Sequence, residues 1–250
     1  MLQYRTNSFT VRVYPFLLLL LVTSNNLFGQ IQGDQPILPS KEIDNLESVY
    51  GVDPSLYNGF LYNSFFPGKV KGDQYFATSN YIKGEATIRG VKYKDIDLNY
   101  DIYKQELLLK YVNSSKVFNI ISISKAWLED FTIGETRFVI FSTPETPNKI
   151  YQVIGNDSIQ VLVHWQKVIA YDNDFQGYTS LYFNINKELN VLVNKSLMKF
   201  NSNKSFVQLF AKDKQAYIKK YLRQNKIKVN SAPDQKMGEL IIYCNKISIK

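Results

Sequence analysis

The chain has 250 residues, of which 45% are hydrophobic and 21% are charged, and it contains 16 Phe and 18 Tyr. A chain of this length and composition can bury one large core or two small ones, so global disorder is excluded. The formal net charge is +8, and the single cysteine, Cys244, cannot form an internal disulfide. The fold must therefore be held by packing alone.

Residues 1–29 are typical of a secretory signal peptide. Arg5 and Arg12 supply a positively charged start, and Phe16–Val22 is an apolar run that is too short to span a bilayer. We expect cleavage after Gly29. The mature protein would then carry no transmembrane segment and would be periplasmic or secreted.

Residues 30–44 contain Pro36 and Pro39 among scattered polar residues, which is typical of an N-terminal arm or linker. We expect a single β-rich domain over residues 45–250, with a helical part over about residues 203–246.

The stretch Tyr50–Gly72 mixes glycine, proline and aromatic residues, which predicts turns with aromatic anchors. Exposed Tyr and Phe side chains build many sugar-binding surfaces, whereas aromatic side chains beside turns are often buried beneath them. We favour the buried interpretation and keep the binding surface as its alternative. The aromatic candidates for binding are Tyr57, Tyr62, Phe65 and Phe66.

The segment Lys94–Ile102 alternates strictly between polar and apolar residues, which predicts a half-buried strand. Glu85–Ile88 and Glu106–Val112 are extended runs on either side of it, and we expect both to pair with it in antiparallel fashion. The polar side chains expected on its outward face are those of Asp95, Asp97, Asn99 and Asp101. At the end of this row, Asp101 is placed to accept hydrogen bonds from the amides of the following turn.

Further extended runs follow as far as Val193. Residues 155–157 (GND) predict a hairpin between Lys149–Ile154 and Ser158–Lys167. Residues 186–188 (NKE) are interpreted as the turn of another hairpin.

After Asn203 the apolar residues recur at helical spacing and predict two or three helices. The last stripe, Met237, Leu240, Ile241 and Cys244, recurs at i, i+3, i+4 and i+7, which assigns Cys244 to packing. Because the strands precede the helices, we predict a β-dominated α+β fold. It would be an antiparallel sandwich or a strongly curved sheet closed by two or three C-terminal helices.

The acidic row overlaps a calcium-binding pattern. Asp95, Asp97, Asn99, Asp101 and Glu106 occupy positions 1, 3, 5, 7 and 12 of an EF-hand loop. Position 6, where the sharp turn requires glycine, is a tyrosine, and both flanks are strand-like. We therefore predict neither a metal site nor any other cofactor.

No catalytic motif is present. His164 is the only histidine, and a zinc site would need further histidines or cysteines as partners. The sequence contains no nucleophile elbow of the serine hydrolases. Glu129 and Asp130 are acids that glycoside hydrolysis could use, but that chemistry depends on their separation across a cleft.

Basic residues are densest near the C-terminus, where Asp213 is the one acid among them. The pattern favours the solvated face of a helix over a nucleic-acid surface. The residues are Lys212, Lys214, Lys219, Lys220, Arg223, Lys226 and Lys228.

Short motifs of glycine, tyrosine and aspartate recur along the mature chain. They are Tyr57-Asn-Gly59, Gly72-Asp-Gln-Tyr75-Phe76, Gly84, Gly90-x-x-Tyr93 and Leu98-x-Tyr100-Asp101, followed by IKKYLRQNKIKV at residues 218–229. With these motifs the chain resembles a group of uncharacterised secreted proteins common in Bacteroidota. The resemblance covers most of the mature chain and implies a cell-envelope or secreted location, but it implies no reaction.

These observations lead us to expect a non-catalytic secreted or periplasmic envelope protein with a binding or structural role. Its partner would be an envelope protein, a glycan or a lipid. One alternative is an envelope glycan hydrolase, for which two facing carboxylates in a deep cleft would be the sign. The other is a lipid carrier with a cavity inside a curved sheet. The carboxylates open to the hydrolase are Asp95, Asp97, Asp101, Glu129 and Asp130.

Overall fold

The computed structural model describes residues 37–38, 53–64, 66, 69–112, 116–143, 147–173, 178–194 and 196–248. The chain divides between Asp34 and Gln35, and all the described residues belong to the second unit. The predicted signal peptide and Phe65 lie outside the described residues.

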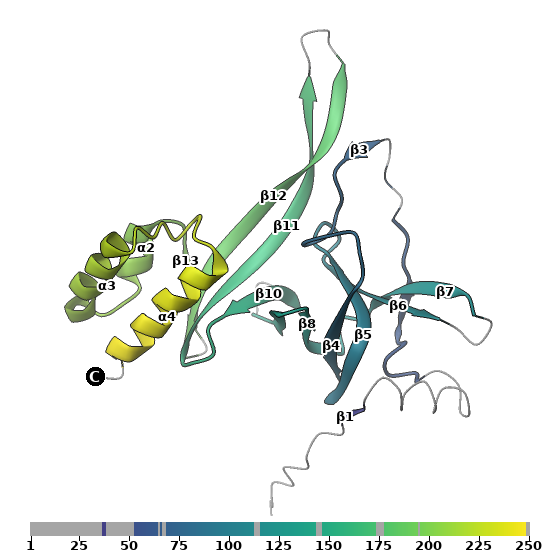
Figure 1. Ribbon diagram of the computed structural model, residues 1–250, viewed down its shortest axis with the longest axis horizontal. Helices are drawn as coiled ribbons and strands as arrows, with labels where there is room; N and C mark the ends of the chain where they lie inside the picture. The colour runs from purple at the N-terminus through teal and green to yellow at the C-terminus, as the bar shows by residue number, and fades with distance from the viewer. Residues whose placement is uncertain are drawn as a thin grey trace, which may run out of the picture. The chain divides into compact units, whose positions relative to one another are not determined.

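The fold is β-dominated, and its strands precede three C-terminal helices, as predicted (Figure 1). The first strands are β1 (Ile37–Leu38), β2 (Gly59–Leu61), β3 (Val70–Lys71), β4 (Ile82–Ile88), β5 (Val91–Asp101), β6 (Glu106–Val112) and β7 (Phe118–Ile123). The later strands are β8 (Leu128–Ile133), β9 (Thr136–Phe141), β10 (Lys149–Ile154), β11 (Ile159–Asn173), β12 (Thr179–Val193) and β13 (Ser196–Phe200). The helices are α2 (Asn203–Gln208), α3 (Lys212–Gln224) and α4 (Asp234–Ser248).

The thirteen described strands form one sheet in the order β13-β12-β11-β10-β9-β8-β4-β5-β6-β7-β2. The pairs along this path are antiparallel, while β1 and β3 add to β5 and β12 in parallel. Side chains of β4, β5, β6, β8 and β9 share one core. The strongly curved sheet is therefore the one of the two predicted arrangements that the protein adopts.

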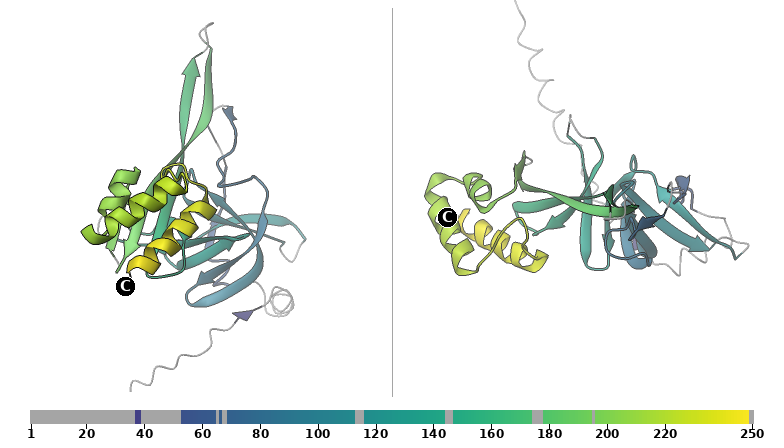
Figure 2. Two further views of the ribbon diagram at one scale, coloured as in Figure 1. Left: turned by 60° about the vertical axis from the view of Figure 1, so that its left-hand side comes forward. Right: turned by 90° about the horizontal axis from the view of Figure 1, so that it is seen from above.

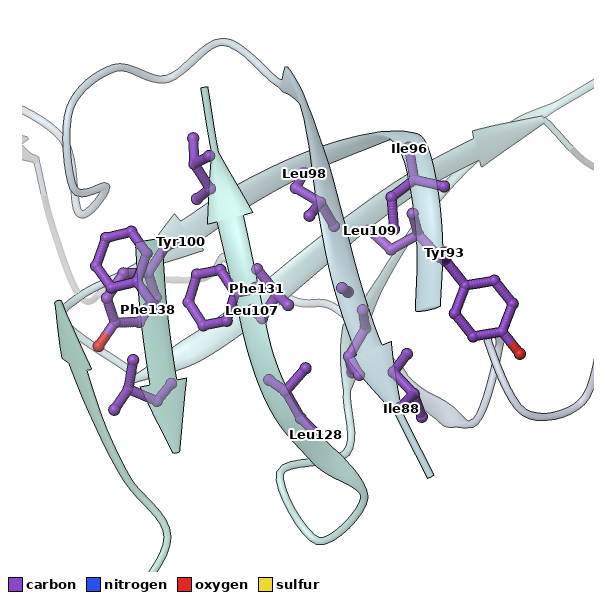
Figure 3. Packing of buried hydrophobic residues seen from close by; sticks show 14 of the residues in the cluster. Ile88, Tyr93, Ile96, Leu98, Tyr100, Leu107, Leu109, Leu128, Phe131 and Phe138 are labelled. Atoms are coloured by element: carbon purple, nitrogen blue, oxygen red, sulfur yellow. The ribbon is translucent and has the colours of Figure 1, made fainter. Parts of the chain in front are cut away.

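The centre of that core is aromatic (Figure 3). Phe131 of β8 and Phe138 of β9 stack with ring centroids 4.7 Å apart, and Tyr100 of β5 meets both rings edge-on. Leu98 and Leu107, from β5 and β6, are fully buried in the same core. This packing explains why apolar residues alternate with polar ones in the predicted strand Lys94–Ile102.

Strand β5 pairs with β4 and β6 as predicted. The prediction that its polar face is exposed is wrong for the second half of the strand. Asn99 and Asp101 are buried, with exposed fractions of 3% and 0%. The segment of residues 74–80 covers them: the Phe76 amide donates to the Tyr100 carbonyl, and the Asn99 side chain donates to the carbonyls of residues 78 and 80. Asp95 remains exposed, at a bulge where its φ is 60°.

The predicted hairpin at residues 155–157 is confirmed, but the predicted turn at residues 186–188 is wrong. Strands β11 and β12 instead form one ladder of fifteen residue pairs, from Ile159 opposite Val193 to Asn173 opposite Thr179. Residues 186–188 pair in register with residues 164–166, so their polarity marks an exposed strand and not a turn. The distal part of this hairpin, residues 168–173 and 178–185, projects from the rest of the sheet, and we call it the arm (Figure 1).

A second core lies where the three helices cover the inner ends of β10, β11 and β12 (Figure 2). Cys244 is fully buried in it, so its predicted role in packing is confirmed. The side chain of Asn245 on α4 accepts from the Ile159 amide at 3.0 Å and donates to the Ile159 carbonyl at 3.0 Å. These two hydrogen bonds hold α4 against the start of β11.

Trp165 of β11 packs against both cores. Its indole Nε1 donates to Gln152 Oε1 at 2.6 Å, and Gln152 Nε2 donates to Asp234 Oδ2 in the first turn of α4 at 2.6 Å. The two cores are therefore joined by packing and by a chain of hydrogen bonds.

Two glycines at the interface between α4 and the β10–β11 turn test this packing. A Cβ on Gly155, which has a φ of +97°, would lie 2.8 Å from Ile241 Cγ2, whereas the nearest atom to a Cβ on Gly238 would be 3.9 Å away. We expect Gly155→Ala to destabilise the protein by about 1–3 kcal/mol, because the contact is too close. Gly238→Ala should stabilise it by up to about 1 kcal/mol through helix propensity. Urea unfolding measures both changes, and changes of the same sign would contradict the described interface.

Candidate functional site

Two of the sequence candidates, Tyr62 and Asp101, are in direct contact. The Tyr62 hydroxyl donates to Asp101 Oδ2 at 2.6 Å, and the Gln74 side chain donates to the Tyr62 oxygen at 3.0 Å. The amides of Tyr103 and Lys104 donate to Asp101 Oδ1 at 2.9 and 2.8 Å, so the predicted role in the turn is confirmed. Burial raises the pKa of Asp101, and these hydrogen bonds oppose that effect only in part.

The outward placement predicted for Asp101 is thus wrong, because residues 62 and 74 close over it. Its carboxylate instead ties the segment that precedes β4 to the turn between β5 and β6. A carboxylate with this many internal donors serves the fold.

The other candidates do not join this contact in the structure. Tyr57 lies against Tyr111, with ring centroids 4.4 Å apart. Phe66 packs edge-on against Tyr103 and against Phe183 of the arm. Asp97 forms a partly exposed ion pair with Lys83 at 3.2 Å, and Lys83 also donates to the Asp95 carbonyl. Phe65 lies outside the described residues.

The acids considered for glycoside hydrolysis are engaged locally. Glu129 accepts from the Gly90 amide at 2.7 Å, and Asp130 accepts from the Thr87 hydroxyl at 3.1 Å. The two acids are successive residues of β8, so their side chains point to opposite faces. Among the described residues, no two carboxylates line any one of the three cavities reported below.

The C-terminal lobe, residues 196–248, carries the whole net charge of the protein. It contains eleven Lys and Arg and three Asp and Glu, a net of +8 that equals the formal charge of the full chain. All residues outside the lobe together are therefore electroneutral. Such a separation of charge creates a strong positive field on one part of the surface.

Within this lobe, α2, α3 and residues 226–228 enclose a groove of about 500 Å³, which we call the basic groove. Val207, Leu222 and Ile227 line it from the core side. In the described part of the chain, no acidic residue lines it and its cations form no ion pair. The exposed cationic side chains of its lining are Lys204, Lys219, Arg223, Lys226 and Lys228.

Local structure explains why these cations converge. Lys219 and Arg223 lie one turn apart on α3, so they share a face. The chain then reverses at Lys226, whose φ is 51°, and Ile227 and Val229 turn inward, which leaves Lys226 and Lys228 outside.

Asn203 at the start of α2 holds this link in place. Its side chain donates to the Ile227 carbonyl at 2.7 Å and accepts from the Val229 amide at 2.8 Å. A smaller cavity of about 220 Å³, with Lys236 in its lining, adjoins the other side of the link and also includes Lys226 and Lys228. The two cavities together extend the positive surface across the link.

A third cavity, of about 390 Å³, lies on β10, β11 and β12, and we call it the polar pocket. His164 contributes a half-buried imidazole, whose Nδ1 lies 2.9 Å from the Ile150 carbonyl oxygen. Because a carbonyl only accepts, Nδ1 carries the proton and donates. Burial lowers the pKa of His164. The residues that line the pocket are Lys149, His164, Gln166, Asn186, Lys187 and Glu188.

Sequence reasoning placed the basic residues on a solvated helix face and missed the groove. The signal for it was the alternation of residues 226–229 (KIKV), which predicts a link with its lysines on one side. The polar pocket carried no such signal, because its side chains come from three strands and meet only through the sheet register.

In comparisons with family models, with curated proteins and with solved structures, no significant match was found for this chain. Among the described residues, no helix has both the length and the apolar character needed to cross a membrane.

Substitution of Asp101 tests its structural role. Asp101→Asn should cost about 1 kcal/mol, because an amide oxygen still accepts from the turn, whereas Asp101→Ala should cost about 3 kcal/mol by leaving a hydroxyl and two amides without an acceptor. The partly exposed Asp97→Asn is the control and should cost at most about 0.5 kcal/mol.

The pH dependence of the Asp101→Asn cost has a defined sign. The pKa of Asp101 in the folded protein is raised above its ordinary value of 3.8. Its contribution to stability is therefore full below that value and is lost as the pH rises through the folded pKa. The cost of Asp101→Asn in chemical unfolding should be larger near about pH 3 than near about pH 7. A cost that grows toward neutral pH would contradict the assignment.

Proposed function

We propose that the protein is a non-catalytic envelope protein that binds the phosphate-bearing headgroups of anionic lipids in the basic groove. The observation that carries the proposal is the convergence of five cationic side chains on one groove that no acid lines. Lysine ammonium groups bind phosphate as compact charges, and Arg223 can add a bidentate contact.

The apolar side of the groove favours a lipid surface. Val207, Leu222 and Ile227 lie beneath the cations, together with the aliphatic stems of the lysines. An amphiphile satisfies both parts, because its headgroup meets the charges while its glycerol and upper acyl region meets the stems. Clusters of four to eight Lys and Arg on a helical surface are typical of anionic lipid recognition.

A nucleic acid fits the groove less well. Single-stranded nucleic acids are bound by stacking of bases on aromatic side chains, and none of the described residues that line the groove is aromatic. The expected signal peptide also favours envelope lipids as the available source of phosphate.

The alternatives from the sequence lack a matching feature in the described residues. A hydrolase would require two carboxylates across a cleft, and the polar pocket contains one, Glu188. A lipid carrier would require a dry cavity inside the sheet, whereas the basic groove lies among the helices.

The test is co-sedimentation of the purified protein with vesicles of phosphatidylglycerol and phosphatidylcholine, compared with vesicles of phosphatidylcholine alone. Each Lys or Arg near an anionic surface contributes about 1 kcal/mol. We therefore expect the triple variant Lys219→Glu, Arg223→Glu and Lys226→Glu to bind the anionic vesicles at least about 100-fold more weakly.

The matched control reverses three exposed lysines of the same lobe outside the lining of the groove, with the substitutions Lys212→Glu, Lys220→Glu and Lys246→Glu. It changes the net charge by the same amount and should weaken binding by less than about tenfold. Equal losses in the two variants would show that net charge alone attracts the protein. Equal binding of the parent protein to both kinds of vesicle would overturn the proposal.

A further inference from the structure

The polar pocket is built on the sheet, on the face that carries His164. The register places His164 opposite Glu188 and Gln166 opposite Asn186, so these four side chains share one face. Lys149 joins them from β10 through its ion pair with Glu188. The pocket therefore rests on paired strands and not on a loop, which fixes the positions of its groups.

The carboxylate of Glu188 already has partners within the protein. Its Oε1 lies 3.3 Å from Lys149 Nζ and 3.3 Å from Asn190 Nδ2, and its Oε2 lies 3.2 Å from Lys199 Nζ. Although burial alone would raise the pKa of Glu188, the hydrogen bonds from Asn190 and Lys199 and the charge of Lys149 lower it. The carboxylate is thus ionised and already accepts from three donors.

The remaining groups of the pocket require a ligand that both donates and accepts. Because Nδ1 of His164 donates to the Ile150 carbonyl, Nε2 of the neutral ring is an acceptor. In the described part of the chain the side chains of Gln166 and Asn186 form no hydrogen bond, and each offers one acceptor and two donors. Lys149 has further N–H donors beyond the one directed at Glu188.

Hydroxyl groups match this set, because each one donates and accepts. An anion without a proton, such as sulfate, only accepts, so it cannot satisfy the imidazole nitrogen or the amide oxygens. We propose that the polar pocket binds a saccharide unit through its hydroxyl groups, with Gln166, Asn186 and the Nε2 atom of His164 as the recognising groups. The volume of about 390 Å³ lies within the range of small-molecule sites.

This site is independent of the basic groove. The two share no lining residue, and they differ in chemistry, because one is uniformly cationic and the other mixes donors with acceptors. Failure of one proposal therefore leaves the other intact.

The single histidine of the chain provides the measurement. In protein labelled with ¹⁵N, the imidazole signals belong to His164 alone and report on the pocket. Glucose, N-acetylglucosamine and sodium galacturonate are titrated separately at constant pH, with sodium sulfate as the probe that accepts hydrogen bonds but donates none. We expect a saturable shift of the His164 signals with at least one saccharide and a smaller, non-saturable shift with sulfate.

Variants then assign the shift to the pocket. The double variant Gln166→Ala and Asn186→Ala, at exposed positions, should bind that saccharide about tenfold or more weakly. The control, Gln208→Ala and Gln224→Ala, removes two exposed glutamines from α2 and α3 and should bind it unchanged. The proposal is overturned if no saccharide shifts the His164 signals saturably, or if both double variants bind alike.

Discussion

The fifteen-pair ladder between β11 and β12 is the constraint on which the rest of the structure depends. At its inner end Val161 and Val191 enter the core beneath the helices, and midway Trp165 packs against both cores. Beyond Trp165, the amide of Lys167 donates to the Ile102 carbonyl, and its ammonium donates to the Asp73 and Tyr75 carbonyls. The same two strands therefore pack against the C-terminal lobe, form the floor of the polar pocket and connect the arm to the turn between β5 and β6.

The basic groove and the polar pocket divide two kinds of chemistry between different parts of the fold. The groove gathers like charges at an exposed helical surface, where water screens their repulsion. The pocket gathers mixed polar groups on the sheet, where Glu188 balances Lys149 and Lys199. On the proposed functions, one surface would attract an anionic membrane over a distance while the other would select hydroxyl groups at contact range.

Periodic features could be predicted from the sequence, and covering segments could not. The stripe that ends at Cys244 and the alternation of β5 both follow from residue spacing, because each face repeats along a regular element. The burial of Asp101 depends on residues 62 and 74, which come from irregular backbone without a period. Residues 186–188 suggest a turn by their polarity, yet pairing with β11 keeps them extended. For the site, the basic residues could be identified from the sequence. The hydrogen bonds of Asn203 that bring them together are tertiary contacts, which the sequence pattern does not predict.

The central claim is that the basic groove of the C-terminal lobe is where the protein binds an anionic lipid surface. Hydrogen exchange measured by mass spectrometry, with and without phosphatidylglycerol vesicles, tests this claim most directly. Slower exchange should be confined to peptides from α2, α3 and residues 226–228. The arm is the competing surface, because Tyr171 and Tyr178 are 72% and 71% exposed. Slower exchange in peptides from the arm, with exchange in the C-terminal lobe unchanged, would contradict the account.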